Sequence, residues 1–341
     1  MPAPDGSPGD RVPIAVSVAL CTRNGAEFVG AQVESILGQS LRPAEIVLSD
    51  DGSTDDTVEI VRRIVEAHAE AHGNAVALTV VVNPEPLGVT GNFESAMRVC
   101  ANDLIALCDQ DDVWREDRLE RAAGEFARRP ELLLLHSDAR IVDRDGVPSG
   151  IGLFVTLGVS EEERRAIHDG DGFAVYIRRN LATGATTMVR RRLLDLALDF
   201  PREWVHDEWL AIVAAALGGA DLVDDTLIDY RQHGANAIGA TALTVRRRFA
   251  KLAEPRTARN ARLLENSRIL VDRLGALAVP VPGSVLALAA GKVVHETFRS
   301  SLARSRPLRV VPIARALRRG DYARFGGGAQ DAVRDLVQPA S

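Results

Sequence analysis

The chain has 341 residues, of which 46% are hydrophobic and 26% charged, and it carries a net charge of −6. These values are typical of a folded protein with one large or two small domains, and they exclude a disordered chain, a collagen-like chain and a disulfide-rich miniprotein. The charge is unevenly spread, since residues 241–341 hold 19 Lys and Arg against 7 Asp and Glu, whereas residues 1–240 hold 22 basic and 40 acidic residues. The chain therefore combines an acidic body with a basic C-terminal region.

The sequence gives no sign of export or of membrane insertion. Cys21, Cys100 and Cys108 show no CxxC spacing, which favours a reducing compartment. The Pro/Gly/Asp-rich N-terminus lacks the apolar segment of a signal peptide. The longest apolar stretch, Leu277–Ala290, contains two prolines, and it is shorter than the roughly 20 residues that a membrane helix needs. We expect residues 1–12 to be disordered and the protein to be cytoplasmic.

In the first half of the chain, short apolar runs alternate with helical patterns. The predicted strands are Ile14–Leu20, Glu45–Leu48, Val76–Val82 and Leu104–Cys108. The predicted helices are Phe28–Leu37, Asp55–Ala69, Asn92–Cys100 and Glu116–Arg128. This alternation predicts an α/β fold, in which a mostly parallel sheet carries helices on both faces. Near-continuous apolar strands agree with that fold, because parallel strands are buried on both sides.

After residue 130 the pattern is less regular. Further strands are predicted at Leu132–His136, Thr186–Val189 and Leu227–Tyr230, a hairpin at Ile141–Val147, and a helix from about Glu208 to Leu217. From Thr241 the chain is rich in Arg, Ala and Leu and is predicted to be helical, with breaks at Pro280, Pro282, Pro307 and Pro312. We place a domain boundary near residue 240.

Polar segments follow three of the predicted strands, at Cys21–Gly25, Ser49–Asp55 and Asp109–Asp112. Ligands of open parallel sheets bind outside the carboxyl ends of the strands, so we expect these segments to converge. A turn could bring Asp109 and Asp111 toward one point, where a cation would relieve their repulsion. Carboxylate oxygens together with substrate phosphates suit Mg²⁺ or Mn²⁺. The alternative is a solvated acidic loop.

The segment that follows the second strand also allows two interpretations. Asp51 could accept the N3–H of a pyrimidine base. The alternative is a turn at Gly52 followed by a helix cap at Ser53 or Thr54. Neither GxGxxG nor GxxxxGK[ST] occurs in the sequence, which argues against a dinucleotide enzyme and a P-loop ATPase.

The second half contains two further candidate segments. Asp207 and Glu208 precede a predicted helix, and either could act as a general base toward an acceptor hydroxyl. They could equally be acids that the helix dipole favours at a helix N-terminus. The segment Tyr230–Asn236 follows a strand, and its Arg231 and His233 could meet a metal-bound diphosphate.

Together these segments resemble family 2 glycosyltransferases of the GT-A fold, and within them a rhamnosyltransferase-like branch. The segments that carry the resemblance are Ser17–Asn24, Ser49–Asp55, Asn92–Glu94, Asp109–Trp114, Ser137-Asp138, Asp143–Gly146, His206-Asp207 and Tyr230–Asn236. The resemblance implies a GT-A domain over 13–240, with a nucleotide-binding half at 13–115 and an acceptor side at 116–240. The basic, helical region 241–341 then forms an extension.

The resemblance also implies roles for individual residues. Asp51 would hold the nucleotide base, Asp109 and Asp111 would form the DxD that carries the metal and diphosphate, Asp207 would be the catalytic base, and His233 would contact the metal or the diphosphate. Further nucleotide-sugar contacts are implied at Thr22, Arg23, Asn24, Asn92, Arg231 and, on the acceptor side, Gly184. Arg23 stands where the family often has an aromatic that stacks on the base. Glu208 likewise replaces an aromatic that frequently follows the motif's Asp.

The implied reaction is an inverting, metal-dependent sugar transfer to a hydroxyl of a glycan, lipid-linked or small-molecule acceptor. The implied donor is dTDP-L-rhamnose, with UDP- and GDP-sugars as alternatives, and no nucleic-acid partner is expected. Two other classes remain open. One is a haloacid-dehalogenase-type phosphatase with Asp109 as nucleophile and Asp111 as acid/base, and the other is a non-catalytic sugar-nucleotide-binding module.

The basic C-terminal region has two interpretations of its own. It could be a helical bundle whose arginines are solvated. It could instead be a patch that docks on the anionic inner face of the cell membrane or on a lipid-diphosphate acceptor.

Overall fold

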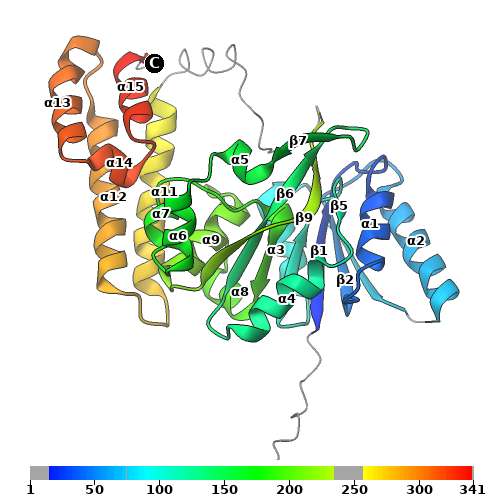
Figure 1. Cartoon of the computed structure of the whole chain (residues 1–341). Coiled ribbons are helices and arrows are strands. Elements are labelled where there is room, and N and C mark those ends of the chain that lie inside the picture. Colours follow the sequence, from blue (N-terminus) through cyan, green and yellow to red (C-terminus); the bar gives the residue numbers. More distant parts are fainter. Residues whose placement is uncertain (1–14, 74, 234–255, 340–341) are drawn as a thin grey trace, which may run out of the picture.

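The computed structural model describes residues 15–73, 75–233 and 256–339 (Figure 1). The elements of its first half are β1 (Val16–Thr22), α1 (Val29–Leu37), β2 (Glu45–Asp50), α2 (Thr57–His72), β3 (Ala77–Val82), α3 (Gly88–Val99), β4 (Leu104–Cys108), β5 (Val113–Trp114) and α4 (Arg118–Arg128). The following part contains β6 (Leu134–Val142), β7 (Pro148–Gly152), α5 (Leu153–Leu157), α6 (Glu161–His168), α7 (Phe173–Tyr176), a 3-10 turn (Gly184–Thr186), β8 (Thr187–Arg190), α8 (Arg191–Ala197), α9 (His206–Ala216) and β9 (Ala220–Arg231). The C-terminal helices are α11 (Arg256–Ala276), α12 (Gly283–Ser301), α13 (Arg306–Arg318), α14 (Asp321–Phe325) and α15 (Ala329–Val337).

Within these residues, nine strands form one mixed sheet in the order β3-β2-β1-β4-β8-β6-β9-β5, and β7 pairs with β6 beside this path. The strands β3, β2, β1 and β4 are parallel, so their carboxyl ends share one edge. Strand β8 is antiparallel to both β4 and β6, so β6 points the same way as β4. Since β6 leads into β7 at the top of Figure 1, the carboxyl edge of the sheet is the upper edge in that view.

Two hydrophobic cores lie on the two faces of the sheet. Along β1, Val18 and Leu20 pack with α1, α2 and α4 on one face. Ala19 and Cys21 pack with α3, α8 and α9 on the other. Every residue of β1 is buried, which explains why its sequence is a continuous apolar run rather than an alternating one.

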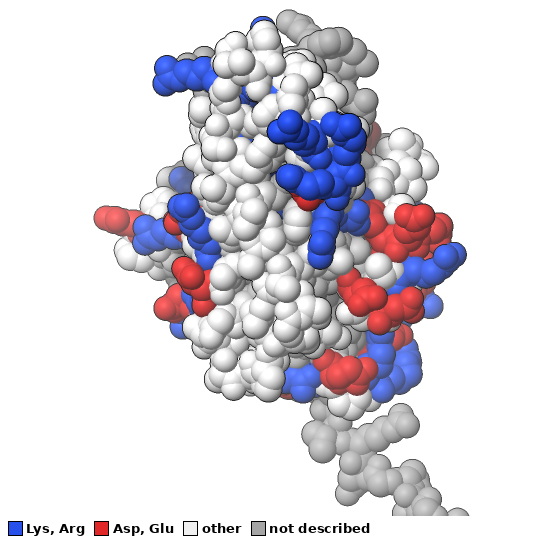
Figure 2. Space-filling model, turned by 90° about the vertical axis from the view of Figure 1, so that its left-hand side faces the viewer, with Lys and Arg blue, Asp and Glu red and all other residues white. Residues whose placement is uncertain are grey.

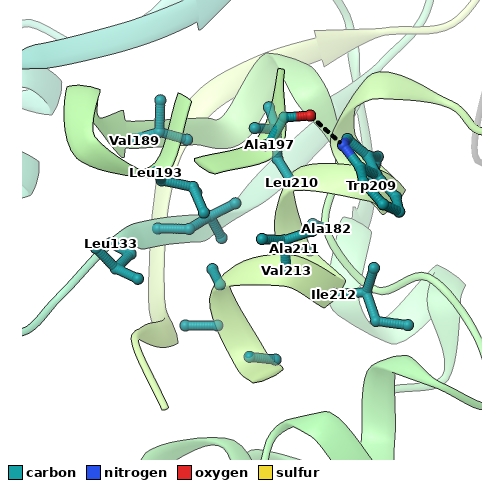
Figure 3. Close-up of a cluster of buried hydrophobic side chains, with 14 of the residues drawn as sticks. Leu133, Ala182, Val189, Leu193, Ala197, Trp209, Leu210, Ala211, Ile212 and Val213 are labelled. Carbon is teal, nitrogen blue, oxygen red and sulfur yellow. Dashed lines mark hydrogen bonds between the residues drawn. The ribbon is translucent and has the colours of Figure 1, made fainter. Parts of the chain in front are cut away.

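Helix α9 is a core helix, and it carries one of the predicted site residues at its beginning. The residues Trp209–Ala216 are all buried, and Figure 3 shows Trp209 to Val213 in one cluster with Val189 of β8 and Leu193 of α8. The indole Nε1 of Trp209 donates to the carbonyl of Ala197 at 2.8 Å. A helix that is apolar all round is held by packing on every side, and this packing fixes the first turn of α9, where Asp207 lies.

The predicted α/β class is confirmed, and each predicted strand overlaps a strand of the sheet in its described residues. Strand β6 continues to Val142, beyond the predicted end at His136. The hairpin is formed by β6 and β7, where the N–H of Asp143 donates to the carbonyl of Val147 at 3.0 Å and Gly146 has a φ of 83°. The strand predicted at Leu227–Tyr230 is only the end of the longer β9. Strand β5 and helices α5 to α8 were not predicted, because each is too short to show a clear hydrophobic period.

The helical prediction for the C-terminal region is confirmed for residues 256–337, with one correction at its prolines. Pro280 and Pro282 lie between α11 and α12, and Pro307 stands at the start of α13. The first turn of a helix tolerates proline because its N–H groups have no helical partner. The break predicted at Pro312 is wrong, since this residue lies inside α13.

The prediction that the arginines of this region are solvated also needs correction, because Arg256, Arg299 and Arg309 are buried. The guanidinium of Arg299 donates to both carboxylate oxygens of Asp335, at 2.7 and 3.2 Å. Arg309 donates to the backbone carbonyls of Asp335 at 3.1 Å and Gln338 at 2.8 Å, where α15 ends. These cations therefore hold the helices of the bundle together.

Several predictions lie outside the described residues, namely the disordered residues 1–12, the boundary near 240 and the end of the segment Tyr230–Asn236 after His233. The division into 13–240 and 241–341 stays a prediction. Among the helices that the structure describes, none combines the length and the apolar character that crossing a membrane requires.

Candidate active site

A cavity of about 490 Å³ lies where β1, β2 and β4 end. All three polar segments that follow these strands contribute to its wall, together with α3, the Asn180–Gly184 segment and the start of α9. The predicted site residues that line it are Thr22, Arg23, Asp51, Asn92, Asp109, Asp111, Gly184 and Asp207. Asn24, Arg231 and His233 stand behind the wall rather than in it. The convergence expected from the sequence is therefore found for most of the predicted residues.

Asp51 closes one side of the cavity and anchors helix α3. Its Oδ1 accepts the N–H of Leu87 at 2.7 Å and its Oδ2 accepts the N–H of Gly88 at 3.0 Å. The side-chain amide of Asn83 donates to Oδ1 at 3.2 Å. A carboxylate at a helix N-terminus is stabilised by the unpaired N–H groups there. Asp51 thus has a structural function even without a ligand.

The neighbouring Asp50 organises the turn that follows β2. Its carboxylate accepts the hydroxyls of Thr22 at 2.7 Å and Ser53 at 2.5 Å. The helix cap predicted at Ser53 or Thr54 is wrong, because the hydroxyl of Ser53 serves Asp50 and α2 begins only at Thr57. The two successive carboxylates therefore have separate structural roles, since Asp50 stabilises the turn after β2 and Asp51 binds the N-terminus of α3.

Asn24 and Asn92 brace the strand ends, Asn24 from the exposed side and Asn92 from the interior. The side-chain oxygen of Asn24 accepts the N–H of Thr54 at 2.8 Å, which ties the loop after β1 to the loop after β2. Asn92 is buried, and its amide donates to the carbonyl of Ser49 at 3.0 Å. Asn24 therefore positions the wall of the cavity, whereas Asn92 also contributes to it.

Two hydrogen bonds with the side chain of Gln110 hold the backbone of Arg23 at the edge of the cavity. Its N–H donates to Oε1 of Gln110 at 2.8 Å, and the amide of Gln110 donates back to the carbonyl of Arg23 at 3.2 Å. A Cβ at Gly25 would come within 2.3 Å of that Oε1, so a larger residue at this position would displace the side chain of Gln110 and break these hydrogen bonds. The guanidinium lies 3.8 Å from Asp51 and is about half exposed, which leaves its planar face accessible for stacking.

The acidic segment after β4 gathers charge at the centre of the site. Burial, together with the charges of Asp111 and Asp207, raises the pKa of Asp109 to about 7. Asp112 is buried and accepts the N–H of Arg231 at 2.8 Å. Burial and the charges of Asp111 and Asp109 raise its pKa as well. The segment is thus under electrostatic stress that a bound cation would relieve.

His233 and Arg231 support this segment from β9. The imidazole Nε2 of His233 lies 2.7 Å from Oδ2 of Asp111, and its ring stacks on Phe28 with the centroids 4.8 Å apart. The guanidinium of Arg231 donates to the carbonyls of Asp111 at 2.8 Å and Arg144 at 2.6 Å. Arg231 therefore binds the protein backbone, which differs from the diphosphate contact expected from the sequence.

The carboxylates of Asp109 and Asp111 both line the cavity, and they are oxygen donors of the kind that a hard divalent cation takes. Within the described part of the chain, no group of three or more His, Cys, Asp and Glu side chains is placed to hold a metal ion by itself. Magnesium usually takes one or two carboxylates and completes its shell with water and substrate phosphates. Asp109 and Asp111 offer two carboxylates for such a shell, and the charge of Asp111 helps to raise the pKa of Asp109.

Asp207 is held in one orientation at the start of α9. Its Oδ1 accepts the amide of Asn180 at 3.0 Å and the N–H of Glu208 at 2.6 Å. Its Oδ2 accepts the N–H of Gly184 at 2.9 Å. Burial and the charge of Asp207 raise the pKa of Glu208 to about 7. Asp207 lines the cavity and Glu208 is not part of the wall, so the geometry favours Asp207 as a base.

The sequence missed several contributors to this region. Asn180 and Thr183 line the cavity without any motif around them. The ring of His206 is buried and stacks on Phe93 with the centroids 3.9 Å apart. Burial lowers the pKa of His206 and so favours its neutral form. From the sequence, His206 was named only as part of the segment His206-Asp207, without a role of its own.

The fold and the cavity together define an α/β protein whose ligand site lies at the carboxyl edge of parallel strands and is rich in carboxylates. Residues 17–195, more than half of the chain, match the family model described as glycosyl transferase family 2. The chain belongs to glycosyl transferase family 2. This membership argues against the phosphatase alternative.

Two curated relatives illustrate the range of the similarity. An uncharacterized protein of Mycobacterium tuberculosis is 24% identical over 237 residues, which cover 69% of this chain and 63% of that protein. The UDP-Glc:alpha-D-GlcNAc-diphosphoundecaprenol beta-1,3-glucosyltransferase WfaP of Escherichia coli is 26% identical over 136 residues, which cover 40% of this chain and 50% of that enzyme. The chain thus spans less than two thirds of the length of these relatives.

Solved structures confirm the predicted GT-A fold. Residues 1–349 of Staphylococcus aureus TarS, in complex with UDP, align with a TM-score of 0.55 at 15% identity and cover 94% of this chain and 89% of that chain. The mannosyltransferase PcManGT of Pyrobaculum calidifontis, in complex with GDP-Man and Mn²⁺, aligns with a TM-score of 0.51 at 20% identity and covers 97% and 84%.

Proposed function

We propose that this chain transfers a sugar from a nucleotide-sugar donor to an acceptor hydroxyl with inversion, using Asp207 as the general base. The observation that carries the proposal is the meeting of Asp207 with Asp109 and Asp111 in one cavity. The charge of Asp207 contributes to the raised pKa of Asp109, which supports their close approach. Inversion needs a base on one side of the sugar and a stabilised diphosphate on the other, and these carboxylates can serve both ends.

The surroundings of Asp207 suit a base that must point at one hydroxyl. Three N–H donors, from Asn180, Gly184 and Glu208, fix its carboxylate. In this role Asp207 takes the proton of the acceptor hydroxyl as the oxygen attacks the anomeric carbon. A positioned general base contributes about 10²–10⁴-fold to the rate.

Asp109, Asp111 and His233 are the residues that we propose to hold a divalent cation beside the diphosphate. Bound Mg²⁺ or Mn²⁺ would supply charge neutralisation for the leaving diphosphate. Arg231 holds the backbone of Asp111 from behind, so that the carboxylate is presented to the cavity. The mannosyltransferase from Pyrobaculum calidifontis was solved with GDP-Man and Mn²⁺, which supports the choice of metal.

The general-base role is tested by Asp207→Asn. We expect transfer to fall by about 10²-fold or more, while donor binding, measured by calorimetry, persists. The matched control is Asp117→Asn, which alters an aspartate at the N-cap of α4 outside the cavity and should leave transfer unchanged. Full activity of Asp207→Asn would remove this residue from the role.

The metal site is tested by Asp111→Ala. We expect the donor affinity to depend on Mn²⁺ in the wild-type protein and to lose that dependence in the variant. Calorimetric titration of UDP in the presence and absence of Mn²⁺ measures this difference. An unchanged Mn²⁺ dependence in the variant would contradict the assignment of the DxD.

For the donor, we propose a nucleoside-diphosphate sugar, with dTDP-L-rhamnose as the first compound to test because of the resemblance to the rhamnosyltransferase-like branch. The structural relatives were solved with UDP and with GDP-Man, so UDP- and GDP-sugars belong in the same panel. A donor that binds only the folded state raises the melting temperature by mass action. The donor that gives the largest shift with Mn²⁺ identifies the nucleotide and the sugar.

For the acceptor, we propose a hydroxyl of a lipid-linked glycan, since the name of WfaP describes a diphosphoundecaprenol-linked sugar as its acceptor. The remaining alternative is a binding module without catalysis. Slow hydrolysis of the donor by the wild-type protein, abolished in Asp207→Asn, would exclude that module. Donor binding without any turnover would support it.

A further inference from the structure

Helix α12 exposes the side that a surface helix normally buries. Its ionisable side chains Lys292, His295, Glu296 and Arg299 follow helical spacing on one side of the helix, and all four are buried. The exposed positions of α12 carry no charged residue; they are Gly283, Ser284, Leu286, Ala287, Ala290, Val294, Thr297, Ser300 and Ser301. In an ordinary surface helix the charged side faces water, so the polarity of α12 is inverted.

Partners inside the bundle explain why the charged side is turned inward. Glu296 pairs with Lys292 at 2.9 Å and with Arg299 at 3.1 Å. Arg299 also pairs with Asp335 of α15 at 2.7 Å. Buried charges are tolerated when opposite charges meet them, so the charged stripe is satisfied within the bundle. The opposite side of α12 is uncharged and exposes Leu286, Ala290 and Val294, and these side chains have no corresponding partner among the described residues.

Helix α13 extends the apolar surface. Leu308, Val310 and Val311 are exposed by 67, 50 and 55%, and Leu317 by 41%. These exposed fractions are high for large aliphatic side chains in one short helix. Val294 of α12 is 70% exposed as well. A protein surface normally carries such side chains singly rather than several in two consecutive helices.

The same helix adds positive charge without any negative charge. No acidic residue occurs between Glu296 and Asp321. Arg304, Arg306, Arg315 and Arg318 are exposed. Within the described ranges none of these four forms an ion pair with a carboxylate. Figure 2, which views the molecule from the side of α12 and α13, shows a broad uncharged surface with Lys and Arg side chains grouped in its upper half and Asp and Glu side chains toward its flanks.

We propose that this surface docks on an anionic lipid membrane. We define the α12–α13 face by the apolar residues Leu286, Ala290, Val294, Leu308, Val311 and Leu317 together with Arg304, Arg306, Arg315 and Arg318. Interfacial helices bind membranes by placing apolar side chains at the headgroup boundary and basic side chains against anionic headgroups. The α12–α13 face offers both kinds of side chain on two neighbouring helices.

The positive charge of the α12–α13 face favours a membrane over a second copy of the chain as its partner. A symmetric dimer places the same patch against itself, so the exposed arginines of α13 would face those of the other copy with no acid of α13 between them. An anionic lipid surface supplies a dense layer of opposite charge instead. The proposal thus commits to the lipid surface, with self-association as an outcome of the test.

Helix α13 lies toward the upper end of the molecule in Figure 1, as does the carboxyl edge of the sheet where the cavity lies. Membrane docking itself does not depend on the proposed transferase function, and its test involves no measurement of activity.

Co-sedimentation of the full chain with lipid vesicles tests the proposal. We expect binding to vesicles of phosphatidylcholine with phosphatidylglycerol, and little binding to phosphatidylcholine alone. The double variant Arg315→Gln/Arg318→Gln should bind the anionic vesicles about 25-fold more weakly, since each basic residue near a membrane contributes about fivefold. The matched control is Arg62→Gln/Arg63→Gln, which makes the same charge change on exposed residues of α2.

A second pair of variants tests the apolar part of the α12–α13 face. Val294→Ser/Leu308→Ser removes exposed side chains and should leave the melting temperature unchanged while weakening vesicle binding at low and at high salt. Absence of binding to anionic vesicles at low salt would overturn the proposal. An equal loss in the α2 control would overturn it too. Sedimentation velocity that shows a dimer which Val294→Ser/Leu308→Ser dissociates would assign the face to a second copy.

Discussion

Substitution of Gly184 by alanine tests the geometry of the site at its tightest point. A Cβ on Gly184 would lie 2.5 Å from Nε2 of His206 and 3.3 Å from its Cε1. Real Cβ atoms do not approach so closely, so the imidazole must move. The same glycine donates its N–H to Oδ2 of Asp207 at 2.9 Å, so a displacement here reaches the proposed base directly.

The surroundings of His206 determine the magnitude of the effect. His206 is 3% exposed and its ring stacks on Phe93 with the centroids 3.9 Å apart, so a movement away from the new Cβ disturbs this stacking. Overpacking of a filled core costs about 1–3 kcal/mol, and we expect Gly184→Ala to lower the free energy of unfolding by this amount. A shift of about 1 Å in a positioned catalytic group costs about 10²-fold in rate, so kcat should fall while the affinity for the donor changes little.

Urea unfolding and steady-state kinetics measure these two effects, and Gly124→Ala is the matched control. A Cβ on Gly124 in α4 would meet the end of Arg128 at 3.6 Å, an ordinary contact. Alanine stabilises a helix interior by about 0.5–1 kcal/mol relative to glycine. The control should therefore gain stability slightly and keep full activity.

A double-mutant cycle isolates the clash. In the background of His206→Ala the nearest remaining atom to the new Cβ is Oδ2 of Asp207 at 3.7 Å, so the further cost of Gly184→Ala should drop below about 0.5 kcal/mol, the range in which independent substitutions add. If Gly184→Ala costs as much in that background as in the wild type, the contact with His206 is not the cause. If it changes neither stability nor kcat, the geometry described for the base is refuted.

Two further predictions concern buried charges. Because the pKa of Glu208 is raised from 4.5 to about 7 in the folded protein, the folded state binds its proton more tightly than the unfolded chain, and its contribution of up to about 3 kcal/mol is present below pH 4.5 and lost as the pH rises through 7. Urea unfolding across this range should show a smaller loss for Glu208→Gln than for the wild type, and an identical slope would contradict the assignment. Arg299→Met leaves the buried Asp335 without its cation and Glu296 with Lys292 alone, and it should lower the free energy of unfolding by about 3–5 kcal/mol. Arg318→Met, at the surface, should change it by less than about 0.5 kcal/mol, and equal effects of the two variants would refute the buried network.

Local pattern was sufficient to predict the parallel half of the fold. The strands β1, β2 and β4 are buried on both faces, so their sequences are continuous apolar runs, and the polar residues that follow them, such as Thr22 and Asp109, were expected at one edge. The rule that ligands bind at the carboxyl edge of a parallel sheet then located the cavity. These inferences succeeded because each depends on residues close together in the chain.

The partners of the proposed base could not be predicted in this way. Asn180 and Gly184 precede Asp207 by 27 and 23 residues, and no motif links them. Their contact is created when the 3-10 turn before β8 packs against the first turn of α9. The backbone contacts of Arg231 could not be predicted for a related reason, since its guanidinium donates to carbonyls of segments more than 80 residues away. Which backbone or ligand group receives the hydrogen bonds of a side chain is decided only when distant segments come together in the folded protein.

The C-terminal helices show a different limit of prediction from sequence. Here the uncertain point is which side of a helix faces the interior of the protein. The spacing of Lys292, Glu296 and Arg299 reveals a charged side of α12, and the usual rule turns such a side to water. Asp335 of α15 reverses that choice, because its carboxylate meets Arg299 inside the bundle. Periodicity identifies two sides of a helix but does not say which is inside when a later helix carries the complementary charge. An inverted bundle must leave apolar side chains outside, so the charge pairs that stabilise these helices and the exposed surface that we assign to a membrane are two consequences of one arrangement.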